Sequence, residues 1–412
     1  MAALGISVII VSRDRPEWLH RCLMAVEQLD YPRFETLVVA CPAGAKVARL
    51  FPSTRVIEFD IANISAARNF GANAALGDVV AFLDDDAVPE PTWLMHLALG
   101  FDDPVVAQVG GMTLGRNGIS VQHAAALVDA TGTSYPVDVS ADTPVVLTAM
   151  DNRHARLHGT NMALRRSVVI AHGGFDERFA FYLDETDLTY RVSMTGGKTV
   201  FAPKAVVHHA SGPSRHRNAD RTPRFTFEIA ASAAVFHTKH CKAPDRDAAR
   251  TTFLTERRKW VLQHMQRGPL PPDTAWALIK QLAAGYEAGL TRAAPTPPTW
   301  EDQPKADVPS RPTALKERCL VAAGHRAKHT YSEARAMAAQ GQRVTVFDYR
   351  RNARYHRVTY TDGGFWLHTG GIYGRELRNE PIFQISTKED RVRRTINRLA
   401  TIRSKNQLII GD

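Results

Sequence analysis

A run of three acidic residues follows directly on a strongly apolar segment, residues 79–83. Such a segment is typical of a buried parallel strand, whose carboxyl end lies at the ligand-binding edge of an open α/β sheet. Side chains two apart on a strand share a face, so we expect Asp84 and Asp86 to point together and Asp85 to point away. Two carboxylates aimed at one spot suit Mg²⁺ or Mn²⁺ held together with a diphosphate. The alternative is an acidic turn that caps a helix starting near residues 89–91.

A second acidic cluster, Asp184, Glu185 and Asp187, lies about 100 residues further along the chain. Acidic residues at a helix start favour the helix dipole, and Asp184 as an N-cap with Asp187 three residues later is a good capping pattern. The functional alternative is a general base that removes the proton of an acceptor hydroxyl. The residues alone leave both interpretations open.

Two adjacent histidines, His208 and His209, end a short apolar segment. Adjacent residues on a strand face opposite ways, so at most one of them should face a site. An imidazole could add a third ligand to Mn²⁺ that is otherwise held by carboxylate and phosphate, although a structural histidine is the common case. Arg68, in the segment before the first acidic run, could pair with a phosphate or hold a carboxylate; the alternative is an ordinary helix-surface arginine.

The elements that must position these residues alternate between strand and helix. We expect strands at residues 5–11, 36–40, 56–59 and 79–83, with helices at 16–29 and 63–75 between them. Further on, strands are expected at 105–112, 159–164, 199–202 and 205–207, and helices at 166–171 and 182–194. Residues 113–157 should be mixed strand and loop that shapes an acceptor side. This order predicts a doubly wound α/β sheet flanked by helices.

The character of the chain changes after residue 221. Helices are expected at 225–240 and 248–266, and a proline-rich, polar linker at 293–312. A fresh strand–helix–strand pattern begins at 319, and the chain stops on an apolar strand at 407–412. We therefore predict four parts, 1–221, 222–292, 293–312 and 313–412, the last a partial Rossmann-like α/β domain from a longer protein.

Charge and composition narrow the functional classes. Residues 1–210 hold 17 Lys+Arg against 23 Asp+Glu, a balance of −6, whereas residues 211–412 hold 35 against 19, a balance of +16. The basic half could make peripheral contact with an anionic membrane surface, or could meet a polyanion or an acidic acceptor. The alternative is a solvated basic surface without a partner, and no motif favours nucleic acid. No apolar run approaches the roughly 18 residues of a membrane span. Four scattered cysteines and no signal peptide predict a reduced, cytoplasmic protein.

Several segments together resemble the family 2 inverting glycosyltransferases of the GT-A fold. The resemblance covers residues 5–215 and rests on an ordered set: Ser7-Val8-Ile9-Ile10 with Arg15-Pro16, Ala67-Arg68-Asn69-Phe70-Gly71, Phe82-Leu83-Asp84-Asp85-Asp86, Gly159-Thr160-Asn161-Met162-Ala163, Gly173-Gly174-Phe175-Asp176, Asp184-Glu185-Thr186-Asp187 and His208-His209. It implies transfer of a sugar from a nucleoside-diphosphate sugar to a glycan or lipid-linked acceptor, with Mn²⁺ or Mg²⁺ as cofactor, in cell-surface polysaccharide synthesis.

The resemblance also implies roles for individual residues. Asp86 and one of His208 and His209 would hold the metal. Glu185, the second acid of a motif that is Glu-Asp in the family and Asp-Glu here, would be the base, with Asp184 beside it. The implied donor-binding residues are Ser12, Asp14, Arg68, Asp84 and Asp85.

One departure from the family pattern leaves the nucleobase open. Many members carry an aspartate at the end of the second strand, whereas residues 38–41 here read Val-Val-Ala-Cys, so uridine, thymidine and guanosine all stay candidates.

Two other functions remain. A sugar nucleotidyltransferase should show a glycine-rich basic loop after the first strand, and residues 12–16 do not supply one. A non-catalytic scaffold should have lost the acids, and they are present. The strand–helix–strand pattern near residues 319–348 faintly suggests the start of a GT-B-like transferase.

Overall fold

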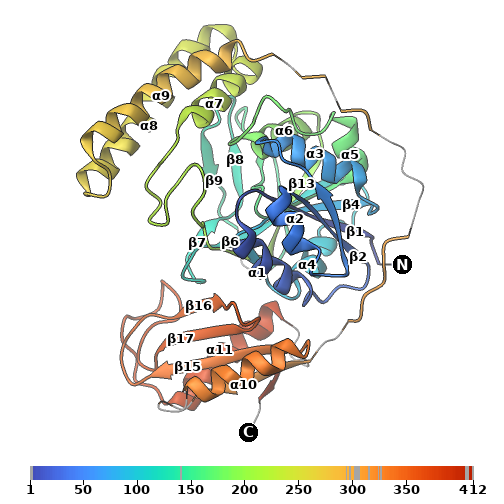
Figure 1. Ribbon diagram of the computed structural model, residues 1–412, viewed down its shortest axis with the longest axis vertical. Coiled ribbons are helices and arrows are strands. Elements are labelled where there is room, and N and C mark those ends of the chain that lie inside the picture. The colour runs from blue at the N-terminus through green and yellow to red at the C-terminus, as the bar shows by residue number, and fades with distance from the viewer. Residues whose placement is uncertain are drawn as a thin grey trace.

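The computed structural model describes residues 3–139, 142–293, 295–296, 298–300, 307–313, 316–322, 324, 327–403 and 408–410. Within these residues, a ten-stranded sheet carries helices on both faces, three helices follow it, and a second, five-stranded sheet lies at the other end of the molecule (Figure 1). The three parts follow one another along the chain. The predicted boundaries at residues 221, 292 and 312 remain predictions.

The large sheet contains the strands that carry the acidic and histidine motifs. Its order is β10 (Val145–Leu147), β13 (Lys198–His209), β6 (Val106–Leu114), β12 (Met162–Arg165), β4 (Val79–Asp84), β1 (Ile6–Ser12), β2 (Phe34–Ala40) and β3 (Thr54–Glu58). Strands β1 to β4 are parallel, and β12 runs antiparallel between β4 and β6. Two short strands complete it: β5 (Ala87–Pro89) pairs with β13, and β7 (Val121–His123) pairs with β6.

Helices cover both faces of this sheet because its central strands are apolar on both sides. In β1, Val8 and Ile10 pack with α1 (Pro16–Val26), α2 (Pro42–Ala48) and α4 (Trp93–Leu99), whereas Ile9 faces α3 (Ile64–Ala74), α5 (Arg166–Ala171) and α6 (Asp184–Met194). A Cβ on Gly71 of α3 would lie 2.5 Å from Ile9 Cγ2, so this helix needs glycine to approach the sheet. The predicted doubly wound α/β fold is confirmed for this part of the chain.

Two details differ from the sequence-based prediction. The short strands expected at 199–202 and 205–207 form one strand, β13, whose register shifts between Ala202 and Val206. Pro203 lies in this interval, and proline cannot donate to a strand ladder, so the chain bulges there and then continues. Helix α2 was not predicted, and neither were α9 (Pro272–Leu290) and α11 (Lys388–Ile402) in the second half of the chain. The mixture expected for residues 113–157 is confirmed: β8 (Ala126–Val128), β9 (Ser134–Pro136) and β11 (His154–Arg156) form a separate three-stranded sheet.

Three helices, α7 (Phe227–His240), α8 (Arg246–Gln266) and α9 (Pro272–Leu290), follow the large sheet, with a 3₁₀ turn at Ala243–Asp245. Helices α7 and α9 lie close together because small residues face one another: a Cβ on Gly289 would lie 2.3 Å from the carbonyl oxygen of Ala231. Helices α8 and α9 lie side by side at the upper left of Figure 1. No helix in the described residues is both long and apolar enough to cross a lipid bilayer.

The second sheet begins after the proline-rich segment, part of which lies outside the described residues. Its order is β16 (Arg357–Tyr360), β17 (Trp366–Gly371), β15 (Arg343–Arg350), β14 (Glu317–Val321) and β18 (Leu408–Ile410). All pairs are parallel except β16 with β17. Helices α10 (Ala327–Ala339) and α11 (Lys388–Ile402) belong to it. We call these elements the C-terminal unit; its assignment as a partial Rossmann-like domain remains a prediction.

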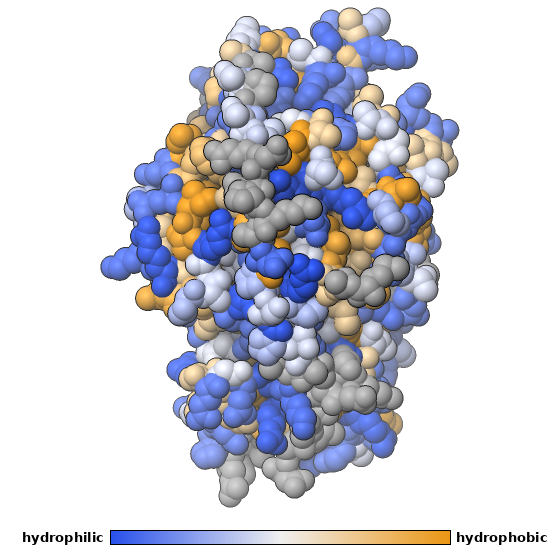
Figure 2. Space-filling view, turned by 90° about the vertical axis from the view of Figure 1, so that its right-hand side faces the viewer, coloured by the Kyte–Doolittle hydropathy of each residue, from blue (hydrophilic) through white to orange (hydrophobic). Residues whose placement is uncertain are grey.

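The surface in Figure 2 differs between the two ends of the molecule. Among the coloured atoms, the lower part, formed by the C-terminal unit, is mainly hydrophilic. Hydrophobic side chains on the upper part occur in several separate groups. On this face, therefore, the coloured atoms show no single large apolar area of the kind that marks a permanent interface.

Candidate active site

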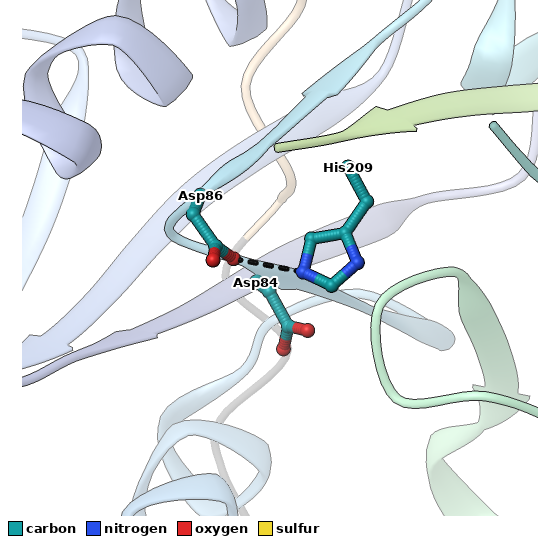
Figure 3. Close-up of side chains that lie close together, drawn as sticks. All are labelled: Asp84, Asp86 and His209. Carbon is teal, nitrogen blue, oxygen red and sulfur yellow. Dashed lines mark ion pairs between the residues drawn. The ribbon is translucent and has the colours of Figure 1, made fainter. Parts of the chain in front are cut away.

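Asp84, Asp86 and His209 meet at the carboxyl end of β4 (Figure 3). Asp84 ends this strand, and Asp86 follows two residues later. Strand β5 then pairs with β13 so that Ala87 lies opposite His209, which places the imidazole beside the acidic run. One ligand atom from each of the three side chains lies within 4.8 Å of the others. The expected common direction of Asp84 and Asp86 is therefore what the structure shows.

Asp86 is almost fully buried and is surrounded by hydrogen-bond donors. Its Oδ2 accepts from Arg15 Nη1 at 2.9 Å, Gly212 N at 2.8 Å and Arg217 Nη2 at 3.2 Å. Its Oδ1 lies 3.2 Å from His209 Nε2. Burial opposes ionisation, but His209 and the arginines outweigh it and hold the pKa of Asp86 well below its usual range. This carboxylate is therefore ionised at neutral pH.

Asp84 is held by two other neighbours. Thr160 Oγ1 donates to Asp84 Oδ2 at 2.6 Å, and Arg68 Nη2 lies 3.4 Å from Asp84 Oδ1. The guanidinium of Arg68, which is 4% exposed, also pairs with Asp184 through Nη1. Arg68 therefore joins the two acidic clusters that lie about 100 residues apart in the sequence. The alternative that Arg68 is an ordinary surface arginine is wrong.

The two histidines face opposite sides of β13, as the alternation of strand side chains requires. His209 points to Asp86, and its Nδ1 lies 2.9 Å from Gln122 Nε2. His208 points away, and its Nε2 lies 2.8 Å from Glu90 Oε1. The structure thus separates the two candidates: only His209 lies with the carboxylates, and the prediction of His208 as a metal ligand does not fit this geometry.

The chemistry of this donor set fits a divalent ion. Two carboxylates and one imidazole are oxygen and nitrogen donors of the kind that Mn²⁺ accepts. The contact from Gln122 to the far nitrogen of His209 is the kind of outer contact that orients a ligating histidine. Asp84, Asp86 and His209 are therefore the residues that would hold the predicted Mn²⁺ or Mg²⁺.

The other candidate donor-binding residues lie around the end of β1. Ser12 Oγ donates to Asp85 Oδ2 at 2.7 Å, and Asp85 also pairs with Arg15. Asp85 is fully buried, and burial raises its pKa to about 7 against the opposing charge of Arg15. The side chain of Asp85 is therefore bound to Ser12 and Arg15 inside the protein, where it holds the loop after β1 in place. Asp14 has a positive φ of 57° and a largely exposed side chain.

A cavity of about 680 Å³ opens beside this loop. Ser12, Asp14 and Arg15 lie on one wall, and Phe181 and His216, whose rings stack with centroids 3.6 Å apart, belong to another. Its volume is within the usual range of small-molecule sites. Because Arg15 both lines this cavity and contacts Asp86, a ligand here would extend toward the candidate metal residues.

The second acidic cluster opens α6, but not as a capping pattern. The N-cap is Leu183, which has a positive φ of 62° and makes no side-chain cap, so the alternative of Asp184 as N-cap is wrong. Asp184 is buried against Arg68, and burial raises its pKa to about 7 although Arg68 acts in the opposite direction. Glu185 is only partly buried, and its carboxylate accepts a hydrogen bond from Thr186 Oγ1 at 3.3 Å.

Asp187 is an anchor for α6. It is fully buried and lies 2.9 Å from Arg191 Nε, 2.8 Å from Lys239 Nζ and 2.8 Å from His240 Nε2. Burial opposes its ionisation, but the hydrogen bond from His240 and the two cations hold the pKa of Asp187 well below its usual range. These contacts fasten α6 to α7, so Asp187 is not available to a substrate.

Four residues that sequence reasoning did not name as site residues touch the site: Arg15, Gln122, Thr160 and Arg217. Arg15 and Thr160 lie in segments that carried the family resemblance, so their positions in those segments were a usable signal. Gln122 lies in the short strand β7 and Arg217 lies outside the helices and named strands, and nothing in their spacing marks them.

Comparison with known proteins identifies a family for part of this chain. The sequence matches the profile described as "Glycosyltransferase like family 2" over residues 3–225. It is 29% identical over 243 residues to the O-antigen biosynthesis protein RfbC of Myxococcus xanthus, covering 55% of this chain and 19% of that protein. It is 29% identical over 204 residues to a pre-mycofactocin glycosyltransferase of Mycobacterium tuberculosis, covering 50% of this chain and 40% of the relative.

Among solved structures, a mannosyltransferase from Pyrobaculum calidifontis in complex with GDP-Man and Mn²⁺ matches with a TM-score of 0.43 and 16% identity, over 71% of this chain and 88% of that one. The chain thus spans less than half the length of either curated relative. The family profile covers more than half of the chain and includes Asp84, Asp86 and His209. This chain belongs to glycosyltransferase family 2.

Proposed function

We propose that the protein is a metal-dependent, inverting glycosyltransferase. It moves a sugar from a nucleoside-diphosphate sugar to a hydroxyl of a glycan or lipid-linked acceptor. The observation that carries this proposal is the meeting of Asp84, Asp86 and His209 beside a cavity large enough for a nucleotide. Family membership supports the reaction class, and the site geometry supports the assignment of residues.

The donor is held between the cavity and the acidic run. The nucleoside occupies the cavity, and Ser12, Asp14 and Arg15 line the wall that leads toward Asp86. Mn²⁺ or Mg²⁺, when bound by Asp84, Asp86 and His209, supplies positive charge that offsets the charge of the departing diphosphate. Arg15 adds a fixed cation on the same side.

Glu185 is the proposed general base. Its carboxylate is partly exposed, whereas Asp184 is tied to Arg68 and is partly protonated near neutral pH because burial raises its pKa to about 7. Glu185 takes the proton of the acceptor hydroxyl while that oxygen attacks the anomeric carbon of the donor. The bond from this carbon to the diphosphate breaks with its electron pair, and a single displacement of this kind inverts the anomeric centre.

The proposed setting is cell-surface polysaccharide synthesis. It is supported by the similarity to a relative named for O-antigen biosynthesis. The nucleobase stays open, because residues 38–41 supply no aspartate at the end of β2. Peripheral membrane contact through the basic second half remains a prediction, which co-sedimentation with anionic lipid vesicles can test.

The decisive experiment is a donor screen in the presence of Mn²⁺. Nucleoside-diphosphate release is measured for the wild type, for Asp86→Ala and for Asp362→Ala, a control carboxylate whose side chain is 86% exposed in the C-terminal unit. The expected result is turnover of one nucleotide sugar by the wild type and by Asp362→Ala, and none by Asp86→Ala. Turnover of no donor by the wild type, or full activity of Asp86→Ala, would overturn the proposal.

A further inference from the structure

The C-terminal unit contacts the large sheet directly behind the candidate metal site. The carbonyl oxygen of Ile402, at the end of α11, accepts from Thr92 Oγ1 at 2.8 Å and lies 2.9 Å from His96 Nε2. The ring of Trp366 in β17 lies 4.9 Å from the ring of His208, the histidine that faces away from the carboxylates. Ile402 thus contacts the segment that follows the acidic run, and Trp366 contacts β13.

Arg403 is the centre of this contact. Its guanidinium is 1% exposed; Nε lies 2.6 Å from Glu90 Oε2, and Nη1 lies 2.5 Å from Glu317 Oε1. Glu90 belongs to the large sheet and Glu317 to the C-terminal unit, and both are also buried. Burial opposes ionisation of Glu90, but Arg403 and the hydrogen bond from His208 together outweigh it and hold the pKa of Glu90 well below its usual range. One cation therefore joins two buried carboxylates from different parts of the chain.

Glu90 connects Arg403 to the site through a short path. Its other oxygen, Oε1, lies 2.8 Å from His208 Nε2, so the carboxylate is fixed between the histidine and the arginine. Its backbone N–H donates to the carbonyl of Val206 at 3.0 Å. Between Asp86 and Glu90 lies only β5, whose three residues pair with β13 as far as His209.

The strand pair β5–β13 sets the positions of both candidate ligands. Asp86 precedes β5, and its carbonyl oxygen accepts from Ala210 N at 3.0 Å; His209 ends β13 opposite Ala87. One end of this pair therefore carries the ligands, and the other end is held by Glu90. Strand β5 has only three residues in this pairing, so the contacts of Glu90 add to the few hydrogen bonds that hold it against β13.

We propose that Arg403 is a positioning residue for the active site: by fixing Glu90 and His208, it holds the β5–β13 pair that places Asp86 and His209. The C-terminal unit thereby sets the geometry of the candidate metal site without contributing a ligand to it. The first test of this inference, Mn²⁺ affinity, rests on the proposed function. The second test, amide hydrogen exchange of β5 and β13, rests on the strand pairing alone.

The physical consequence of losing Arg403 follows from its burial. Arg403→Met would leave Glu90 and Glu317 without the cation between them, and an unpaired buried carboxylate is strongly unfavourable. The segment carrying Glu90 would then shift or open to hydrate it, and β5 would move with it. Outer contacts of metal ligands contribute about 10–100-fold to affinity, so for a residue one step further out we expect about a threefold to tenfold loss.

A matched control exists on the same helix. Arg391 in α11 is also 1% exposed and pairs with the buried Glu376 at 2.9 Å, but this pair lies within the C-terminal unit. Arg391→Met therefore imposes the same chemical change at the same depth without touching Glu90. Glu90→Gln, which keeps the shape of the side chain, is the second variant should Arg403→Met fold poorly.

The experiment compares full-length wild type, Arg403→Met, Glu90→Gln and Arg391→Met. Mn²⁺ affinity is measured by electron paramagnetic resonance, and amide hydrogen exchange of β5 and β13 is measured without metal. We expect Arg403→Met and Glu90→Gln to weaken Mn²⁺ binding and to speed exchange in β5, with Arg391→Met close to wild type in both.

Either of two results would overturn the inference: unchanged β5 exchange in both interface variants, or equal effects in Arg391→Met. Failure of the proposed function looks different. The wild type would then bind no Mn²⁺ and turn over no donor, while the exchange measurement would still decide whether Arg403 holds the strand pair.

Discussion

Replacing Glu185 by glutamine tests whether Glu185, rather than Asp184, is the general base. Glutamine keeps the size of the side chain and its capacity to accept the weak hydrogen bond from Thr186, but it cannot take a proton. A positioned general base contributes about 10²–10⁴-fold, so we expect kcat to fall by that factor, or about 2.7–5.4 kcal/mol in activation free energy. Because Glu185 neither belongs to the Asp84, Asp86 and His209 cluster nor lines the cavity, donor and Mn²⁺ binding should stay near the wild-type values.

The neighbouring change, Asp184→Asn, should produce a different defect. Asp184 is buried against Arg68, and this arginine also lies 3.4 Å from Asp84 Oδ1. With the charge of Asp184 removed, Arg68 would neutralise Asp84 more completely and compete with a divalent ion for it. We therefore expect weaker Mn²⁺ binding and a raised donor KM, with a smaller effect on kcat at saturating donor and metal.

The assay is nucleoside-diphosphate release at saturating donor, metal and acceptor, with donor and Mn²⁺ affinities measured separately by calorimetry. The reasoning is refuted if Glu185→Gln retains more than about a tenth of the wild-type kcat, since a base contributes more than that. A large kcat loss in Asp184→Asn with intact binding would move the role of base to Asp184.

Three further predictions concern the supports of the site. Thr160→Val removes the 2.6 Å hydrogen bond to Asp84, so Mn²⁺ affinity measured by calorimetry should fall about tenfold. Asp187→Asn should lower the free energy of unfolding by about 3–5 kcal/mol at pH 7 in urea titrations, since Arg191, Lys239 and His240 all lose the same buried carboxylate. The folded-state pKa of Asp187 is depressed, so this difference should persist above pH 4 and shrink as the pH falls further. Gly111→Ala would place a Cβ 2.1 Å from the carbonyl oxygen of Ala205, so thermal unfolding should occur at least about 4 °C lower.

Controls separate these effects from general damage. Thr160→Ser keeps the hydroxyl and should retain most of the metal affinity. Gly173→Ala is a poor match for Gly111→Ala because of its positive φ, whereas a Cβ on Gly115 would make only ordinary contacts, the nearest at 3.6 Å to the carbonyl oxygen of Ser120, so Gly115→Ala is the suitable comparison. A stability difference for Asp187→Asn that widened on acidification would contradict the assigned direction of its pKa.

Much of the large sheet was predictable because local pattern and tertiary environment agree there. Parallel strands buried on both faces need uninterrupted apolar runs, and residues 79–83 form such a run. The strand and helix positions around it follow from the same rule. The boundary of β13 was harder, because Pro203 reads as an interruption in sequence while the strand continues past it as a bulge.

The helix-cap interpretation of Asp184 shows where local pattern misleads. The spacing of Asp184 and Asp187 matches a capping pattern, but the backbone turns through Leu183 in a left-handed conformation, and helix α6 starts one residue earlier than a cap at Asp184 requires. Each carboxylate instead forms an ion pair with a residue from another helix: Asp184 with Arg68 of α3, and Asp187 with Lys239 of α7. No local rule contains these partners.

The sequence by itself determined which side chains could do chemistry and, through the two-residue period of a strand, that Asp84 and Asp86 share a face. It also determined that His208 and His209 must diverge, but not which one faces the acids. Only the tertiary structure decided this, because the choice depends on the register of β13 against β5. The same holds for Arg403, which lies more than 300 residues from Glu90 in sequence. Such long-range partners are brought together by the packing of whole helices and strands. Their separation in the sequence gives no pattern from which the pairing could be predicted.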